Sequence, residues 1–193
     1  LSGPKRYHPA LRTMILMNEP DLKLQSGFLQ GVPGPPEHFC KALVSALDAV
    51  LDAEREAGVE GPLPNLTVAF SFARCPKCSR FGDHPSLGQM WDLRRAMKHP
   101  ELVGYLPRNN LWAIYRARFV NSFNTANSAL DMRHQFLDMY DEHFQGTPVF
   151  IGEYHSPYFF DQQLDLEEIL EISANRSTML QGICFFEFQV RYD

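Results

Sequence analysis

The sequence predicts an α/β fold in which helices cover a parallel β-sheet. Five short apolar stretches alternate with longer stretches in which apolar residues recur at helical spacing. The short stretches are apolar at nearly every position, which is typical of parallel strands buried on both faces. Two architectures satisfy this order: an open doubly wound sheet, and part of an eight-stranded barrel.

The first half of the chain alternates strand and helix twice. Residues 13–18, TMILMN, predict a short buried strand, and residues 66–73, LTVAFSFA, predict a second one. Between them, apolar residues recur at helical spacing over residues 37–57 after a proline-rich loop, and Gly58 ends this helix. A shorter helix is expected over residues 87–97.

The next segment is ambiguous. Residues 111–124, LWAIYRARFVNSFN, suit either a helix or a strand in their first part. We favour a strand around residues 118–122, because polar residues then fall at its end. Residues 128–144 predict a helix from their apolar spacing, and residues 148–153, PVFIGE, predict another short apolar strand.

The last two elements complete the alternation. A helix is expected over residues 164–180, with Asp165 as its N-cap and Glu168 three residues on, as in a capping box. Residues 182–190, GICFFEFQV, predict the final strand. The predicted order is therefore five strands separated by four helices.

Composition argues against several classes of function. The chain has 193 residues, 45% of them hydrophobic, which fits one domain with a substantial core. Its formal net charge is −5, and its scattered basic residues do not suggest nucleic-acid binding; the tightest basic group, residues 92–99, is interpreted as a solvated helix face. No stretch approaches the roughly 20 apolar residues of a membrane span, and no signal peptide is recognised. No glycine-rich nucleotide loop follows a strand, so no cofactor is expected.

Only two of the four cysteines have a recognisable spacing. Cys75 and Cys78 form a Cys-x-x-Cys pair, which supplies half of a structural zinc site. His84 offers a third ligand, but no fourth is evident, so we interpret the pair as loop cysteines, bonded or free. Cys40 and Cys184 lie in apolar patterns and are expected to be small core residues.

Three carboxylates directly follow predicted strands. Glu19 comes after MILMN, Glu153 after VFIG, and Glu187 after ICFF. In parallel α/β folds the chemistry collects at the C-terminal ends of the strands. Glu19 and Glu153 on one rim of a barrel could approach to the roughly 5 Å that retaining glycosidases use. The plainer interpretation is that each Glu is a solvated strand end or an ion-pair partner.

The neighbours of these carboxylates suit carbohydrate chemistry. Asn18 carries an amide that can bind a sugar hydroxyl beside the reacting carbon, and Gly152 leaves space next to Glu153. Tyr154 and His155 offer further hydrogen-bond donors. Aromatic side chains near strand ends could stack on sugar rings, although most aromatic residues belong to cores; those considered are Tyr158, Phe159 and Phe188.

Three motifs in order resemble one enzyme family. The sequence MNEP at 17–20 resembles the fourth-strand motif of clan A glycoside hydrolases, retaining β-glycosidases with a (β/α)8 TIM barrel. FIGEYHSP at 150–157 resembles the seventh-strand motif, and LQGICFFEFQ at 180–189 is similar to the last strand of β-1,3-glucanase-like members. The resemblance implies that Glu19 is the acid/base, that Glu153 is the nucleophile, and that the chain holds strands 4 to 8.

The chain departs from this family in three places. Residues 1–11 are too short for strands one to three, so the resemblance implies an incomplete barrel: a fragment, one half of a two-chain barrel, or a decayed relative. The sixth strand often presents His or Tyr to the nucleophile, whereas here Asn124 is the expected contact. The eighth strand often presents Trp, whereas here Glu187 and Phe188 are expected to contact substrate.

The leading hypothesis is that residues 1–193 form a single partial barrel catalytic domain. It would be a retaining glycoside hydrolase or transglycosylase acting on a β-linked glucan or a related polysaccharide. A non-catalytic carbohydrate-binding relic of the same fold is the alternative, and a metal-dependent enzyme using the three Glu residues is a third. A polysaccharide substrate would suit an extracellular location, to which the sequons at Asn65 and Asn175 add little because about one is expected by chance. The oligomeric state is not predicted.

Overall fold

The computed structural model describes residues 5–24, 32–154 and 161–186, which form one five-stranded sheet with helices around it. All neighbouring strands are parallel, and their order in the sheet is their order in the sequence. The α/β class and the parallel sheet are thus confirmed. The strands are β1 (Thr13–Asn18), β2 (Asn65–Ser71), β3 (Asn121–Thr125), β4 (Val149–Tyr154) and β5 (Leu180–Phe185).

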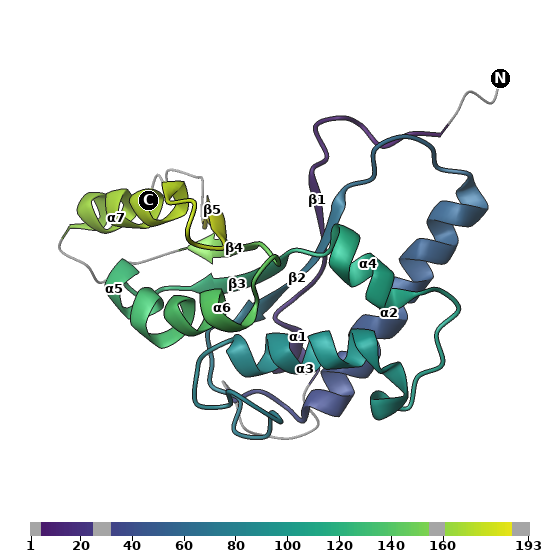
Figure 1. The fold of residues 1–193 in the computed structure, drawn as a ribbon, viewed down its shortest axis with the longest axis horizontal. Coiled ribbons are helices and arrows are strands. Elements are labelled where there is room, and N and C mark those ends of the chain that lie inside the picture. Colours follow the sequence, from purple (N-terminus) through teal and green to yellow (C-terminus); the bar gives the residue numbers. More distant parts are fainter. Residues whose placement is uncertain (1–4, 25–31, 155–160, 187–193) are drawn as a thin grey trace, which may run out of the picture.

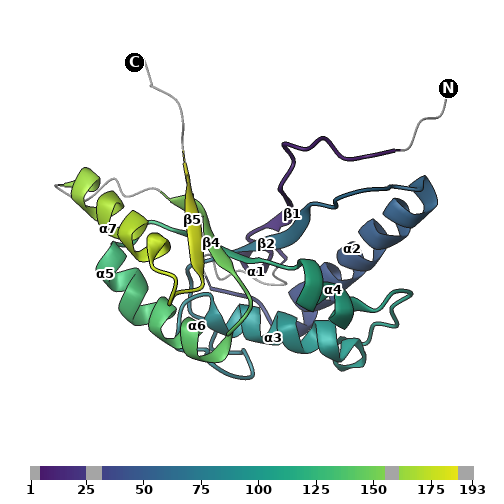
Figure 2. The same cartoon turned by 45° about the horizontal axis from the view of Figure 1, so that its top comes forward.

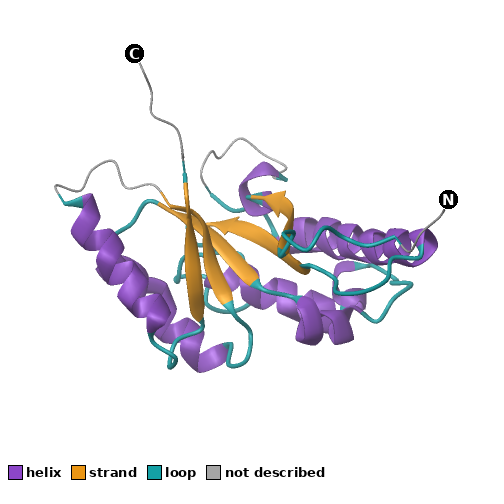
Figure 3. Cartoon of the chain, turned by 90° about the horizontal axis from the view of Figure 1, so that it is seen from above, coloured by secondary structure: helices purple, strands orange, loops and turns teal. Residues whose placement is uncertain are grey.

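Helices connect the strands and cover one face of the sheet, as Figures 1 and 2 show. Figure 3 shows the strands as neighbours in a twisted sheet. Parallel neighbours joined by crossovers of one hand place every connecting helix on the same face. The helices are α1 (Pro20–Lys23), α2 (Pro36–Ala57), α3 (Leu87–Lys98), η1 (Pro100–Val103), α4 (Leu111–Arg118), α5 (Ala129–Met132), η2 (Arg133–Leu137), α6 (Asp138–His143) and α7 (Gln162–Ala174).

The two faces of the sheet differ in chemistry. The face toward the helices is apolar: Phe70 on β2 packs edge-on against Phe39 of α2, and Phe123 on β3 lies 4.5 Å from Phe136, between ring centroids. These side chains belong to one buried core. The opposite face, here called the inner face, carries small and polar side chains instead. Its members on β2 and β3 are Thr67, Ala69, Ser71, Ser122 and Asn124.

The ambiguous segment resolves differently from the favoured prediction. Residues 111–118 are helical, and β3 begins only at Asn121, so the strand expected around residues 118–122 was wrong in its start. The side chain of Asn110 caps the helix by accepting a hydrogen bond from Ala113 N at 3.0 Å. Arg118, the last residue of α4, forms a buried bidentate ion pair with Glu54 of α2, with hydrogen bonds of 2.6 and 2.7 Å. This pair fixes the end of α4 against α2.

The last helix also begins and ends earlier than predicted. Its N-cap is Asp161, which accepts a hydrogen bond from Leu164 N at 2.9 Å, and the helix ends at Ala174. Asp165, the predicted N-cap, lies inside the first turn and accepts a hydrogen bond from Ala129 N. It therefore ties α7 to α5. The predicted helix over residues 128–144 forms as three consecutive helical segments, with a π-helical turn in the middle.

One of the two predicted core cysteines is confirmed and the other is wrong. Cys40 is buried in the core, as expected, whereas Cys184 lies on β5 at the edge of the described sheet and is exposed, so its core assignment was wrong. Cys75 and Cys78 form a disulfide in the loop after β2. Among the helices that the structure describes, none has the length and apolarity needed to cross a bilayer.

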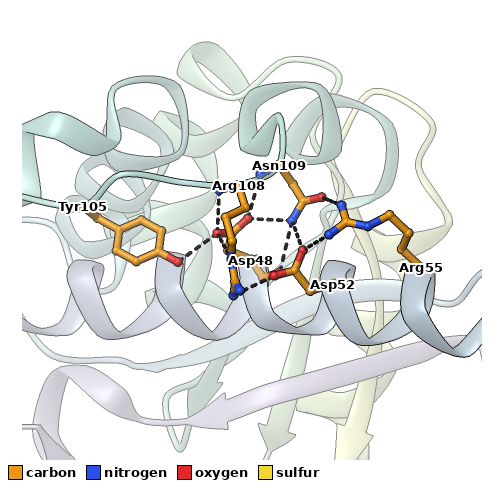
Figure 4. Close-up of polar contacts among 6 residues, drawn as sticks. All are labelled: Asp48, Asp52, Arg55, Tyr105, Arg108 and Asn109. Carbon is orange, nitrogen blue, oxygen red and sulfur yellow. Dashed lines mark hydrogen bonds and ion pairs between the residues drawn. The ribbon is translucent and has the colours of Figure 1, made fainter.

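A buried carboxylate fixes the connection between η1 and α4 to the long helix α2 (Figure 4). Asp48 is fully buried and accepts hydrogen bonds from Tyr105 Oη at 2.8 Å, Arg108 N at 2.8 Å and Asn109 N at 2.9 Å. Asn109 Nδ2 also donates to Asp48 and to Asp52. The anchored segment spans the space between α3 and α4, so Asp48 fixes how these two helices sit on α2.

The same contacts set the charge state of Asp48. Burial raises the pKa of this carboxyl, but the hydrogen bonds from Arg108, Asn109 and Tyr105 together outweigh burial and lower the pKa below its ordinary value of 3.8. A carboxyl whose pKa is lowered by folding stabilises the fold above its unfolded pKa. That stabilisation is lost as the pH falls through the folded pKa.

We expect Asp48→Asn to lower the free energy of unfolding at neutral pH by about 2–3 kcal/mol, because an amide group would face donors that need a carboxylate. The difference from the unmodified chain should shrink as the pH falls below 3.8. Urea unfolding at about pH 7 and about pH 3 measures both effects. Asp83→Asn, on an exposed side chain, is the control. A pH-independent difference would contradict the assigned role.

Candidate active site

The end of β1 turns sharply at Glu19. Its backbone adopts the left-handed conformation (φ 50°, ψ 52°), which is uncommon for a residue with a side chain. The Glu19 N–H donates to Ala69 O on β2 at 2.7 Å, so the strand pairing continues up to this residue. Pro20 then begins α1, where its missing N–H costs nothing. The turn holds Glu19 at the C-terminal edge of the sheet.

A bulge in β1 places Asn18 on the inner face. Ile15 pairs with Thr67 and Asn18 pairs with Ala69, so three steps along β1 match two along β2. One extra residue moves every later side chain to the other face of a strand. Asn18 therefore projects beside Ala69 instead of toward the helices.

A second bulge does the same for Glu153. Ile151 pairs with Phe123 and Glu153 pairs with Asn124, so Gly152 is the extra residue on β4. Bulges often redirect a side chain next to a functional site. Here the bulge brings the Glu153 carboxylate to the same face as Asn124.

Two asparagines link the two predicted catalytic carboxylates. Asn18 Nδ2 donates to Glu153 Oε1 at 2.8 Å, across 135 positions of sequence. Asn124 Nδ2 donates to Asn18 Oδ1 at 2.9 Å and lies 3.3 Å from Glu19 Oε1. The two carboxylates thus occupy one hydrogen-bonded cluster at one edge of the sheet. Glu19 keeps 28% of its side chain exposed and Glu153 is also partly exposed, so a ligand can reach both.

A buried carboxylate that the sequence analysis did not single out holds the turn in place. Asp21 is fully buried and accepts hydrogen bonds from Ser71 Oγ at 2.6 Å, Ser71 N at 3.2 Å and Gln89 Nε2 at 3.1 Å. Burial raises the pKa of Asp21, and these hydrogen bonds oppose the rise. Asp21 fastens the segment after Glu19 to the end of β2. An acidic residue directly after the proline was the only sequence signal for it.

Gly152 is required by close packing on the inner face. A Cβ at this position would lie 2.7 Å from Ser122 Oγ, 2.9 Å from Asn124 Oδ1 and 3.3 Å from the Ala69 Cβ. From the sequence, Gly152 was expected to leave space beside Glu153. The structure shows instead that Asn124 and Ser122 occupy that space.

The other predicted substrate contacts do not join this cluster. Tyr154 pairs with Thr125, points to the opposite face and is buried in the core, where its hydroxyl donates to Asp165. Its expected place beside the Glu153 carboxylate is therefore corrected, because the residue after the bulge alternates back to the helical side. The remaining predicted contacts, His155, Glu187 and Phe188, lie outside the described residues, as do Tyr158 and Phe159.

No metal centre emerges within the described ranges. There, no group of three or more His, Cys, Asp or Glu side chains is arranged to hold a metal ion. The Cys75 and Cys78 sulfurs are bonded to each other, and His84 Nδ1 lies 3.0 Å from Gln135 O. Glu187, the third carboxylate of the metal hypothesis, is outside the described residues.

Comparisons of the chain with protein-family models, with curated proteins and with solved structures found no match. The function is therefore inferred from the chemistry of the site itself. Its elements are two accessible carboxylates, two amides that link them, and a buried Asp that holds the turn.

We expect Gly152→Ala to lower the free energy of unfolding by about 1–3 kcal/mol, because the new methyl group would displace Asn124 or Ser122. Gly182→Ala on β5 is the matched control, since a Cβ there meets nothing within 4 Å. Denaturant unfolding of both variants measures the difference. Equal effects of the two substitutions would contradict the close packing described for Gly152.

Proposed function

We propose that the chain is a retaining glycoside hydrolase or transglycosylase acting on a β-linked glucan or a related polysaccharide. Glu19 is the acid/base in this proposal, and Glu153 is the nucleophile. The observation that supports it is the amide-linked cluster, which brings two carboxylates from distant strands to one edge of the sheet. Retaining glycosidases need such a pair at roughly 5 Å.

The proposed reaction takes two displacements. Protonated Glu19 donates its proton to the glycosidic oxygen as the bond to the anomeric carbon breaks, and a Glu153 oxygen attacks that carbon to form a glycosyl ester. Glu19, now a carboxylate, then takes a proton from water or from a sugar hydroxyl. The oxygen so activated attacks the anomeric carbon and releases Glu153. The product keeps the β configuration.

The asparagines have distinct roles in this scheme. Asn18 donates to Glu153 and so would orient the attacking oxygen, and in this scheme its amide also binds the sugar hydroxyl beside the reacting carbon. Asn124 donates to both Asn18 and Glu19. It therefore links the proposed acid/base, Glu19, to Asn18, which orients the proposed nucleophile. Positioned groups of this kind lower the barrier because little rearrangement precedes the reaction.

The order of the strands supports the barrel part of the proposal. A doubly wound sheet reverses its strand order at a switch point, where ligands bind. The described sheet runs from β1 to β5 without reversal and carries its helices on one side, as consecutive strands of a (β/α)8 barrel do. We therefore propose that β1 to β5 correspond to barrel strands 4 to 8.

The alternative is a carbohydrate-binding relic of the same fold. Ile15 on β1 and Phe185 on β5 are 47% and 52% exposed at the two edges of the described sheet, which favours a site with incomplete walls. Binding of a β-glucan oligosaccharide without any hydrolysis would support this alternative against the enzyme.

We expect Glu153→Gln to lower kcat on an aryl β-glucoside by about a thousandfold or more, because the covalent intermediate cannot form. Glu19→Ala should lower the rate by about 100- to 10,000-fold, and azide should restore it by attacking the ester without a general base. Steady-state kinetics with and without azide measure both.

The control for these variants is Glu168→Gln, on the exposed surface of α7, which should leave turnover unchanged. Circular dichroism of each variant checks that the fold is intact. Normal turnover by both the Glu19 and the Glu153 variants would sink the proposal.

The stereochemistry provides an independent test. Because a double displacement inverts the anomeric carbon twice, the first product seen by proton NMR should be the β anomer. An α anomer appearing first would show a single displacement and would exclude Glu153 as a nucleophile.

A further inference from the structure

A pocket on the outer helical layer collects both tryptophans of the chain. It lies between α3 and α4 and has a volume of about 330 Å³, at the lower end of the roughly 300–1,000 Å³ typical of ligand pockets. Trp91 and Trp112 line it, and the chain has two Trp residues in all. The remaining lining residues are Arg94, Arg95, Lys98 and His99.

The helical period of α3 creates one wall of this pocket. Trp91, Arg94, Arg95 and Lys98 are spaced by three and four residues and therefore share one face of the helix. This basic group was interpreted from the sequence as a solvated helix face. In the structure Trp112 of α4 lies opposite, so this face lines a pocket that is partly open to solvent.

Positive charge predominates in the pocket, although the whole chain is acidic. Arg95 is partly neutralised by Asp92 at 3.3 Å, and His99 faces Glu101 at the same distance. Arg94 donates to the carbonyl oxygen of His143 at 2.8 Å. Two full cationic charges, on Arg94 and Lys98, thus remain beside the indoles without an ion pair among the described residues.

The two aromatic walls of the pocket are held in place by packing against other rings of the protein. Trp112 stacks on Tyr115, with centroids 5.5 Å apart and planes 10° from parallel. Trp91 packs edge-on against Phe81 at 5.3 Å. The segment that joins the two walls is the one that Asp48 fixes to α2 (Figure 4). A preformed pocket loses little entropy on binding.

We propose that this pocket binds an acidic saccharide, with the uronic acids as the simplest case. The apolar face of a pyranose ring can lie on an indole, and a carboxylate attached directly to that ring stays close to it. A cation lies over each indole: Lys98 Nζ is 5.7 Å from the Trp112 ring centroid, and the Arg94 guanidinium is 5.8 Å from that of Trp91. A carboxylate on a sugar ring packed against either indole would therefore lie within reach of a positive charge. A nucleotide fits less well, because a ribose separates its phosphate from the base that would stack.

The pocket is separate from the carboxylate cluster. Helix α3 follows the C-terminal end of β2 and crosses back toward the N-terminal edge of the sheet, and the pocket residues lie along its length to its C-terminal end. The carboxylates lie at the opposite, C-terminal edge. The pocket therefore does not extend that site; it would fasten the protein to an acidic polysaccharide independently of any reaction.

Intrinsic fluorescence tests the proposal directly, because every tryptophan of the chain lines the pocket. The full chain is titrated with trigalacturonate, with a neutral glucose trisaccharide and with AMP. We expect a saturable change in emission with trigalacturonate. The neutral trisaccharide should bind about tenfold more weakly, since losing one charge-assisted contact costs about that factor. AMP should also bind more weakly, because its ribose holds the phosphate away from the base that would stack. Added salt should weaken the binding of trigalacturonate.

Substitutions identify the site. Lys98→Glu should weaken trigalacturonate binding about tenfold or more, whereas Lys77→Glu, the same charge change on the exposed disulfide loop, should leave it unchanged. Glu153→Gln should bind as tightly as the unmodified chain, which keeps this test independent of the proposed enzyme activity. The proposal is overturned by an absence of saturable binding, by equal or tighter binding of the neutral sugar or of AMP, or by equal losses in the two lysine variants.

Discussion

The hydrogen bond from Asn18 to Glu153 is the contact on which the candidate site depends. It joins the first and fourth strands of the described sheet across 135 positions of sequence, and Asn124 on the strand between them extends it to Glu19. Asn18 and Glu153 reach the inner face only because β1 and β4 each carry a bulge, whereas Asn124 lies on that face through the regular alternation of β3. Without the extra residue, Asn18 and Glu153 would point into the apolar core, where an unpaired carboxylate would be very costly.

The turn after β1 shows how a strained backbone is held. A left-handed Glu costs free energy that its surroundings must offset. The offset comes from both sides: Glu19 N extends the ladder to Ala69, and buried Asp21 receives three hydrogen bonds from Ser71 and Gln89. Strain maintained in this way at a carboxylate is a common feature of functional sites, and here it coincides with the predicted acid/base.

The sequence predicted most of the elements and named the four side chains of the hydrogen-bonded cluster, but not the buried Asp21 beneath it. Strands near residues 13–18, 66–73 and 148–153 were recognisable because each is a short, nearly continuous apolar run. The start of β3 was misplaced, because the apolar residues of α4 suit either conformation and the deciding contact, Arg118 with Glu54, lies far away in sequence. Tyr154 was assigned to the site because sequence proximity to Glu153 does not reveal a bulge.

The sequence by itself determined the alternation of strands and helices, the apolar strand faces, and the positions of Glu19 and Glu153 at strand ends. These are local properties, set by hydrophobic period and by residues that end a strand. Only the tertiary structure decided which face each carboxylate occupies, that Asp21 is buried beneath the turn, and that both tryptophans meet in one basic pocket. Register and helix packing depend on contacts between residues distant in the chain, and the local pattern does not encode them.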